Sequence, residues 1–295
     1  MILNPTARSG RAGELQKTIA QLSPRVLIRI TDSEDDAQRL SQEGAGDGFP
    51  IIVAAGGDGT INAVVNGLAN FRNVTLGLLP VGTMNVFATE LGIPTNDLAA
   101  AWKIIEDGRT RRIDLPRANG KYFVQLAGAG LDAEVVRDTT PDFKKALGPL
   151  SYLLTLAQVA ARRPPRIHVA PIDGPPREGR FVLVGNGRLY GGPFVLFHEA
   201  RLDDGHLDVI VFQNQSHWDL MRYVQAIAFG NHAKLPDVEY FQTRGLQLSS
   251  RDRVPVEIDG ELTGSLPCEI GFSGHRLSVL VPDSQPALPT AGFST

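Results

Sequence analysis

The sequence has very few sulfur groups that could cross-link the chain or bind metal. Cys268 is the single cysteine among 295 residues. One cysteine excludes an internal disulfide and any zinc site built from several thiolates, and it is typical of proteins kept in a reducing compartment. We therefore interpret Cys268 as a structural residue and expect a cytoplasmic protein.

A large net charge and long apolar runs are also missing. The 29 Lys and Arg against 32 Asp and Glu give a formal net charge of -3, which argues against a broad basic surface for nucleic acid. Apolar residues nowhere run for the roughly 18 positions that a membrane-spanning helix needs. The start, Met1 to Pro5, has no charged leader before an apolar core, so we predict neither a membrane span nor a secretion signal.

Two common nucleotide-binding patterns, Gly-x-x-x-x-Gly-Lys-Ser/Thr and Gly-x-Gly-x-x-Gly, are absent from the glycine turns that follow the apolar strands. Instead, residues 51–62 read Ile-Ile-Val-Ala-Ala-Gly-Gly-Asp-Gly-Thr-Ile-Asn, a buried strand followed by a glycine turn. Glycine lets backbone N–H groups approach anionic oxygens, and Thr60 can cap the helix that follows. A second such turn, with Gly82 and Thr83, follows the strand that ends at Pro80. Together the two turns predict a shared nucleotide pocket, with Asp58 beside the phosphates.

Residues 1–112 alternate strand and helix patterns. This alternation predicts an α/β domain with a parallel sheet, and it places ligands at the carboxyl ends of the strands. The expected strands are 1–3, 26–30, 51–55 and 75–80, and the expected helices are 12–22, 34–42, 61–68, 85–91 and 98–107.

The β-rich runs that follow predict a second domain, a mainly antiparallel β-sandwich over residues 113–275. A last strand near 276–282 could complete the first domain, which the sequence leaves open. Residues 283–295 are predicted to form a disordered tail. The one helix expected in this half is 147–163, and whether its apolar face packs on the sheet or contacts lipid is also open.

Four polar turns complete the candidate site. Asn4 and Pro5 end the first strand and lead to Ser9, Gly10 and Arg11, whose guanidinium could bind a phosphate. A glycine-rich turn spans 185–192, and acidic turns span 203–208 and 257–261. Carboxylates at this density fit Mg²⁺ or a general base, although solvated turns between strands would show a similar composition.

These motifs together resemble one family. Asn-Pro, Gly-Gly-Asp-Gly-Thr, Gly-Thr-x-Asn, Gly-Asn-Gly-Arg-x-Tyr-Gly-Gly, Asp-Asp-Gly-x-Leu-Asp and Ile-Asp-Gly-Glu occur in that order over residues 2–282. The chain resembles the bacterial diacylglycerol kinase and lipid kinase family, which includes sphingosine and ceramide kinase relatives. The resemblance implies a two-domain kinase whose first domain is like those of NAD kinases and phosphofructokinases, with the active site in the cleft between the domains.

The resemblance also implies roles for individual residues. Asp259 would be the general base toward a lipid hydroxyl, Glu261 would support it, and Asp58 would organise metal and phosphate charge. The expected ATP-binding residues are Asn4, Ser9, Gly10, Arg11, Thr31, Gly57, Asp58, Gly59, Thr60, Ile61, Asn62 and Thr83. The expected Mg²⁺ ligands are the Asp204 carboxylate and the backbone carbonyls of Arg201 and His206.

Two positions depart from the family pattern. Ala63 stands where an acid is usual, and Thr89 where an arginine is usual. These departures keep a catalytically weak nucleotide- or lipid-binding regulator open beside the lipid kinase, and an NAD kinase-like enzyme is the nearest enzymatic alternative. As partners we expect a lipid substrate met at a membrane surface through peripheral contact, and no nucleic acid. The acceptor lipid and a homodimeric state stay open.

Overall fold

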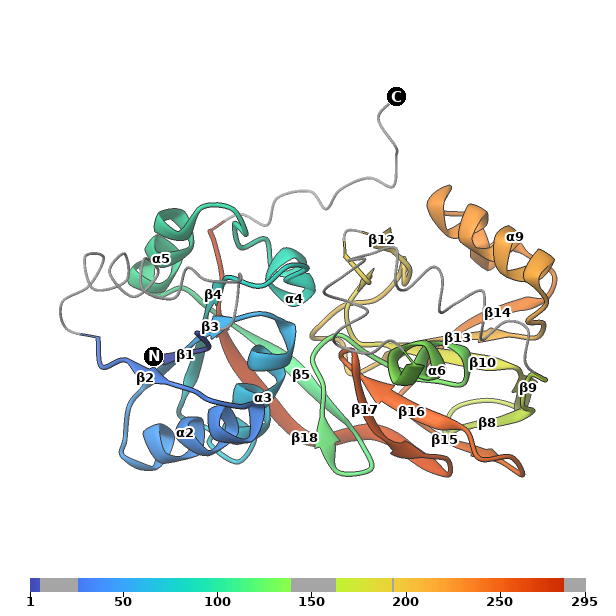
Figure 1. Cartoon of the computed structure of the whole chain (residues 1–295), viewed down its shortest axis with the longest axis horizontal. Helices are drawn as coiled ribbons and strands as arrows, with labels where there is room; N and C mark the ends of the chain where they lie inside the picture. Colours follow the sequence, from blue (N-terminus) through green and yellow to red (C-terminus); the bar gives the residue numbers. More distant parts are fainter. Residues whose placement is uncertain (6–25, 139–162, 193, 284–295) are drawn as a thin grey trace.

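A computed structural model describes residues 1–5, 26–138, 163–192 and 194–283 of the chain (Figure 1). The predicted helix 12–22, nearly all of the predicted helix 147–163 and the predicted tail lie outside these residues.

The first part of the chain is a parallel sheet between helices. Its strands are β1 (Ile2–Leu3), β2 (Arg29–Ile30), β3 (Ile51–Gly56) and β4 (Thr75–Pro80), in the order β2-β1-β3-β4. Its described helices are α2 (Glu34–Gly46), α3 (Asp58–Leu68), α4 (Val86–Glu90) and α5 (Leu98–Asp107). Figure 1 shows α2 and α3 on one side of these strands and α5 on the other. Strand β3 is buried almost throughout, as its apolar run predicts for a sheet covered on both faces.

One long strand carries this sheet into the second part of the chain. Strand β18 (Cys268–Leu280) pairs in parallel with β4 through Ser278 and Val279. It also pairs antiparallel with β5 (Thr110–Ala118) and with β15 (Gly245–Ser250). The sheet continues through β8 (Ile167–Pro171) and β9 (Arg177–Gly179), while β6 (Lys121–Tyr122) pairs with β5. The ten strands therefore form one mixed sheet, parallel at one end and antiparallel at the other.

A second, antiparallel sheet packs against this extension. Buried side chains from both sheets, such as Val169, Val184 and Leu248, fill the space between them and form a sandwich core. The six strands run in the order β14 (Val238–Thr243), β13 (Leu207–Phe212), β10 (Phe181–Gly185), β7 (Leu126–Ala129), β16 (Pro255–Ile258) and β17 (Glu261–Ser265). Two short strands, β11 (Leu189–Tyr190) and β12 (Phe194–Val195), form a separate pair.

Among the described residues of the second half, two α-helices were not predicted. They are α6 (Leu131–Asp138) and α9 (His217–Ala228), which lie on the outer face of the second sheet (Figure 1). The expectation of a single helix in this half was therefore wrong. The missed signal for α9 was its start, where Ser216 and Asp219 form a capping box that satisfies the first backbone N–H groups.

Candidate functional site

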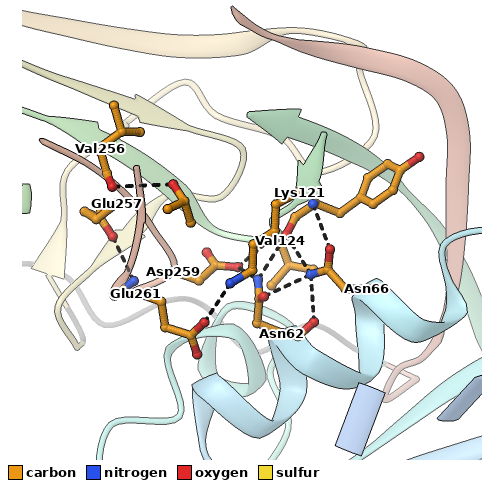
Figure 2. Close-up of polar contacts among 11 residues, drawn as sticks. Asn62, Asn66, Lys121, Val124, Val256, Glu257, Asp259 and Glu261 are labelled. Atoms are coloured by element: carbon orange, nitrogen blue, oxygen red, sulfur yellow. Dashed lines mark hydrogen bonds and ion pairs between the residues drawn. The ribbon is translucent and has the colours of Figure 1, made fainter. Parts of the chain in front are cut away.

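Asp259 lies in the turn between β16 and β17 with its carboxylate surrounded by donors. Its φ of 46° is in the left-handed region, which an aspartate tolerates better than most residues. Oδ1 accepts the backbone N–H groups of Gln125 and Leu126, each at 3.0 Å. Oδ2 accepts the backbone N–H of Val124 at 2.9 Å and Asn62 Nδ2 at 2.7 Å, and Figure 2 shows Asn62 and Val124 converging on it. An ionised carboxylate offers about four lone-pair sites, so these donors occupy it fully.

The pKa of Asp259 reflects two opposing effects. Burial disfavours the charged form and raises the pKa to about 6, while the four hydrogen bonds lower it and offset part of that effect. A carboxylate with such a pKa is charged at neutral pH yet basic enough to accept a proton. To do so it must first lose one of its donors.

Asn62 is the one donor to Asp259 that comes from the first domain, and its Nδ2 also donates to the Tyr122 carbonyl at 3.2 Å. It projects from α3, whereas the three N–H groups belong to the segment leading into β7 (Figure 2). Asn66, one helical turn further along α3, donates to Asn62 Oδ1 and to the Tyr122 carbonyl at 3.0 Å each and accepts the Tyr122 N–H at 2.9 Å. Asn62 was predicted to bind ATP, and Asn66 was not predicted as a site residue.

Three titratable side chains, Glu34, Lys121 and Glu261, lie together at the start of α3. Glu261 on β17 forms an ion pair with Lys121 on β6 at 2.9 Å (Figure 2). A Cβ on Gly59 would lie 2.6 Å from Glu34 Oε1 and 3.0 Å from Glu261 Oε1, so both carboxyl groups flank the first turn of α3. Partial burial and the hydrogen bond with Glu261 raise the pKa of Glu34 to about 7. Neither Glu34 nor Lys121 was predicted as a site residue.

A buried acid supports the Asp259 turn from behind. Glu257 Oε2 accepts the Gly260 N–H at 2.8 Å. Burial and the neighbouring Asp132 raise the pKa of Glu257 well above its ordinary value, and Tyr190 donates to Asp132. These contacts tie the turn to α6 and β11.

The two glycine turns of the first domain touch through their backbones. A Cβ on Gly82 would lie 2.4 Å from the Gly57 Cα, which leaves no room for a side chain. Gly57 is the N-cap of α3 and provides no side-chain cap, so the first N–H groups of the helix can bind an anion. Thr60 is held by Asn4, whose Nδ2 donates to Thr60 Oγ1 at 2.9 Å. The turns therefore offer a backbone cradle that fits a phosphate group.

Asp58 also has a structural contact. Its carboxylate accepts the backbone N–H of Phe87 at 3.4 Å and thereby joins the start of α3 to α4. Burial raises its pKa, while the backbone hydrogen bonds from Phe87, Val86 and Asn85 lower it. Asp58 lies one helical turn before Asn62, so α3 connects the glycine turn to Asp259.

The remaining predicted ATP-binding residues occupy different surroundings. Thr31 and Ile61 are buried at 2% and 1% exposure, so only their backbone groups are available, whereas Thr83 is exposed. The structure does not describe Ser9, Gly10 or Arg11.

The predicted Mg²⁺ ligands lie in the turn before β13. Asp204 Oδ1 accepts the His206 N–H at 3.0 Å, which leaves Oδ2 for a cation. Neighbouring acids have other partners, since Arg111 binds Asp203 at 2.9 Å and Arg276 binds Asp114 at 2.8 Å. One carboxylate oxygen and two backbone carbonyls fit the oxygen preference of Mg²⁺. The described residues contain no group of three His, Cys, Asp or Glu side chains suited to a metal.

Ala63 and Thr89, the two positions that depart from the family pattern, each fit their surroundings in the structure. Ala63 is buried at 8% exposure in the first core. Thr89 Oγ1 donates back to the Asn85 carbonyl at 3.0 Å. The acid beside it, Glu90, crosses to the second domain and accepts the N–H groups of Arg188 and Leu189 at 2.9 and 3.0 Å. Glu90 was not predicted as a site residue.

The described residues include no helix that combines the length and apolarity needed to cross a bilayer.

Family models match both halves of the chain. Residues 1–118 match the diacylglycerol kinase catalytic domain, and residues 125–281 match the YegS C-terminal NAD kinase beta sandwich-like domain. A diacylglycerol kinase of Bacillus subtilis (strain 168) is 33% identical, covering 96% of this chain and 95% of that protein. A diacylglycerol kinase of Staphylococcus carnosus (strain TM300) is 30% identical, covering 96% and 94%.

Solved structures agree with these matches. A diacylglycerol kinase from Bacillus anthracis str. Sterne superimposes with a TM-score of 0.77 at 26% identity and covers 96% of each chain. An NAD kinase from Archaeoglobus fulgidus, solved with ATP, gives a TM-score of 0.51 at 12% identity over 96% of this chain and 93% of that one, which shows the fold alone. The predicted fold class is thus confirmed, and the chain belongs to the diacylglycerol kinase family.

Proposed function

We propose that this protein transfers the γ-phosphoryl group of ATP to the hydroxyl of diacylglycerol or a related lipid. The observation that carries the proposal is the position of Asp259, a carboxylate of raised pKa held beside the phosphate-binding end of α3. Family membership supports the lipid acceptor. The likeness to an NAD kinase is one of fold alone, so the NAD kinase alternative has less support.

In this proposal the chain positions the reactants and moves one proton. The N–H groups at the start of α3 bind the phosphates, and Asp259 accepts the proton of the acceptor hydroxyl. Loss of the Asn62 hydrogen bond would free a lone pair of the carboxylate for that proton. Glu261, paired with Lys121, keeps the surrounding charge balanced.

A cation accompanies this chemistry in the proposal. Glu261 and, when it is ionised, Glu34 place negative charge beside the phosphate cradle, and a bound Mg²⁺ would neutralise charge there. Asp204, with the carbonyls of Arg201 and His206, would hold a second, structural Mg²⁺. We further propose that the chain divides into two domains, residues 1–112 with 276–282 and residues 113–275. We also propose a cytoplasmic location with peripheral membrane contact. A homodimer is the proposed assembly.

The test is phosphorylation of diacylglycerol in detergent micelles by wild type, Asp259→Asn and Asp252→Asn. The first variant should lose activity by ~100-fold or more, since general-base catalysis contributes factors of that order. Asp252 is exposed and serves as the matched control. Full activity of Asp259→Asn would disprove the assignment, and replacing the lipid by NAD tests the alternative acceptor. ATP binding without transfer to any lipid would instead favour the regulator.

A further inference from the structure

Helix α9 presents an apolar face to solvent. Trp218, Met221 and Val224, with Phe229 at its C-terminal end, are 79%, 64%, 52% and 73% exposed. Their spacing places them on one side of the helix, because residues three or four apart are neighbours on its surface. The opposite side, which includes Leu220, packs on the sheet. Helix α9 is therefore apolar on both sides.

The charged groups of α9 avoid this exposed face. Arg222 turns to one flank, where it binds Asp237 at 2.5 Å and Asp219 at 3.1 Å. His217 and Gln225, both exposed and each four residues from Met221, are the polar residues on this same side. A surface helix ordinarily carries charged residues on its solvent side, and a contiguous exposed apolar patch marks a contact surface.

The apolar face continues toward the candidate active site. Strand β12 packs against α9, and its Phe194 is 43% exposed. The partner strand of β12, β11, packs against α4. Met84 lies just before α4 and is 46% exposed. A Cβ on Gly192 would lie 2.8 Å from the Met84 Cε, so Met84 also contacts the turn after β11. Figure 1 shows α4, β12 and α9 in a row along the upper edge of the molecule.

A hydrogen bond links this row to Asp259. Gln125, whose N–H holds the Asp259 carboxylate, donates its side-chain Nε2 to the Leu189 carbonyl of β11 at 2.9 Å. The strand pair β11–β12 therefore lies between the carboxylate and the apolar face of α9.

We propose that the exposed face of α9, together with Phe194, is the surface through which this protein docks on a lipid bilayer. The inference rests on the proposed function, because an acceptor with two acyl chains stays in the membrane and the enzyme must reach it there. Tryptophan and phenylalanine are favoured where an apolar helix face enters the boundary between headgroups and acyl chains. Since the face carries no lysine or arginine, its binding depends on apolar insertion rather than on anionic lipid.

The experiment measures flotation of the full chain with vesicles of phosphatidylcholine containing diacylglycerol. The double variant Trp218→Ala, Phe229→Ala should partition ~10-fold or more weakly, because it removes two large apolar groups from the bilayer. Wild-type binding should change little when salt is raised or an anionic lipid is added. Ile172→Ala is the matched control, since Ile172 is 70% exposed in the loop after β8, away from α9.

Activity on diacylglycerol in detergent micelles separates the two proposals. We expect the double variant to retain wild-type turnover there while losing activity on vesicles. Wild type that turns over no micellar diacylglycerol would refute the proposed function itself. Equal vesicle binding by wild type and double variant, or no vesicle binding by either, would refute the docking surface. A wild-type dimer that the double variant converts to monomer would refute it too, by assigning α9 to a second copy of the chain.

Discussion

At the scale of single residues, the raised pKa of Asp259 sets the pH dependence of the proposed reaction. Asp259 accepts a proton only when ionised, and burial raises its pKa to about 6. Activity should therefore be low below this pH and should rise as the pH increases through about 6. The measurement is kcat/KM for the lipid between pH 5 and 8 at saturating ATP. A profile flat across this range would contradict the role of Asp259 as base.

The hydrogen bond from Asn62 gives a second prediction about the same carboxylate. The Asn62 side chain favours the charged form of Asp259, so Asn62→Ala should raise the pKa of Asp259 further. The pH at which kcat/KM rises to half its maximum should increase by roughly one pH unit, because a hydrogen bond to a charged group contributes about 1.5 kcal/mol.

The matched control for that change is Asn214→Ala. Asn214 also donates to an aspartate, Asp237, at 2.9 Å, but on the exposed surface beyond β13. Asn214→Ala should leave the pH at which activity rises unchanged. If activity rose at the wild-type pH in both variants, Asn62 would not control the proton affinity of Asp259.

At the scale of elements, the contact between the two glycine turns explains why β3 and β4 end as they do. Gly82→Ala would bring a Cβ within 2.4 Å of the Gly57 backbone, which cannot move as a flexible side chain can. We expect a loss of about 1–3 kcal/mol in unfolding free energy and weaker ATP binding. Chemical denaturation measures the first and titration calorimetry the second.

Gly46→Ala provides the contrasting substitution. A Cβ on Gly46, at the end of α2, would meet nothing within 4 Å, and alanine favours the helix. Its stability should be unchanged or slightly higher. An equal loss of unfolding free energy in Gly82→Ala and Gly46→Ala would mean that the contact between the two glycine turns does not stabilise the protein.

The elements also show which parts of the site could be predicted from the sequence. Apolar runs ending in glycine located β3 and β4, and the helix 98–107 was predicted with the bounds of α5. Helix α9 was missed because the capping box of Ser216 and Asp219 that starts it was not recognised among the surrounding strand patterns. The contact of Asn62 with Asp259 joins positions 197 residues apart, and no local pattern encodes it. Glu34 and Lys121 are ordinary surface residues in the sequence, and only folding brings them to Glu261.

At the scale of the whole molecule, Glu90 links the two domains. It is 7% exposed and accepts the N–H groups of Arg188 and Leu189 and the Gln125 side chain at 2.9, 3.0 and 3.1 Å. Glu90→Ala would leave the buried Leu189 N–H without its acceptor, which costs about 1–3 kcal/mol. It would also remove the bond to the Arg188 N–H and one of the two acceptors of the Gln125 amide. We expect a marked fall in the midpoint of denaturant unfolding. Glu106→Ala removes one hydrogen bond within α5, from Trp102 to the exposed Glu106, and should lower the midpoint less.

The shape of that unfolding curve tests how the domains are coupled. Strand β18 pairs with β4 in the first domain and with β15 in the second, so one sheet runs through both. Loss of Glu90 removes one side-chain link between the domains but leaves this backbone link intact. The variant should therefore unfold in a single transition at a lower denaturant concentration, with fluorescence and circular dichroism changing together. Two separate transitions would show that Glu90, rather than the shared sheet, makes the domains unfold as one unit.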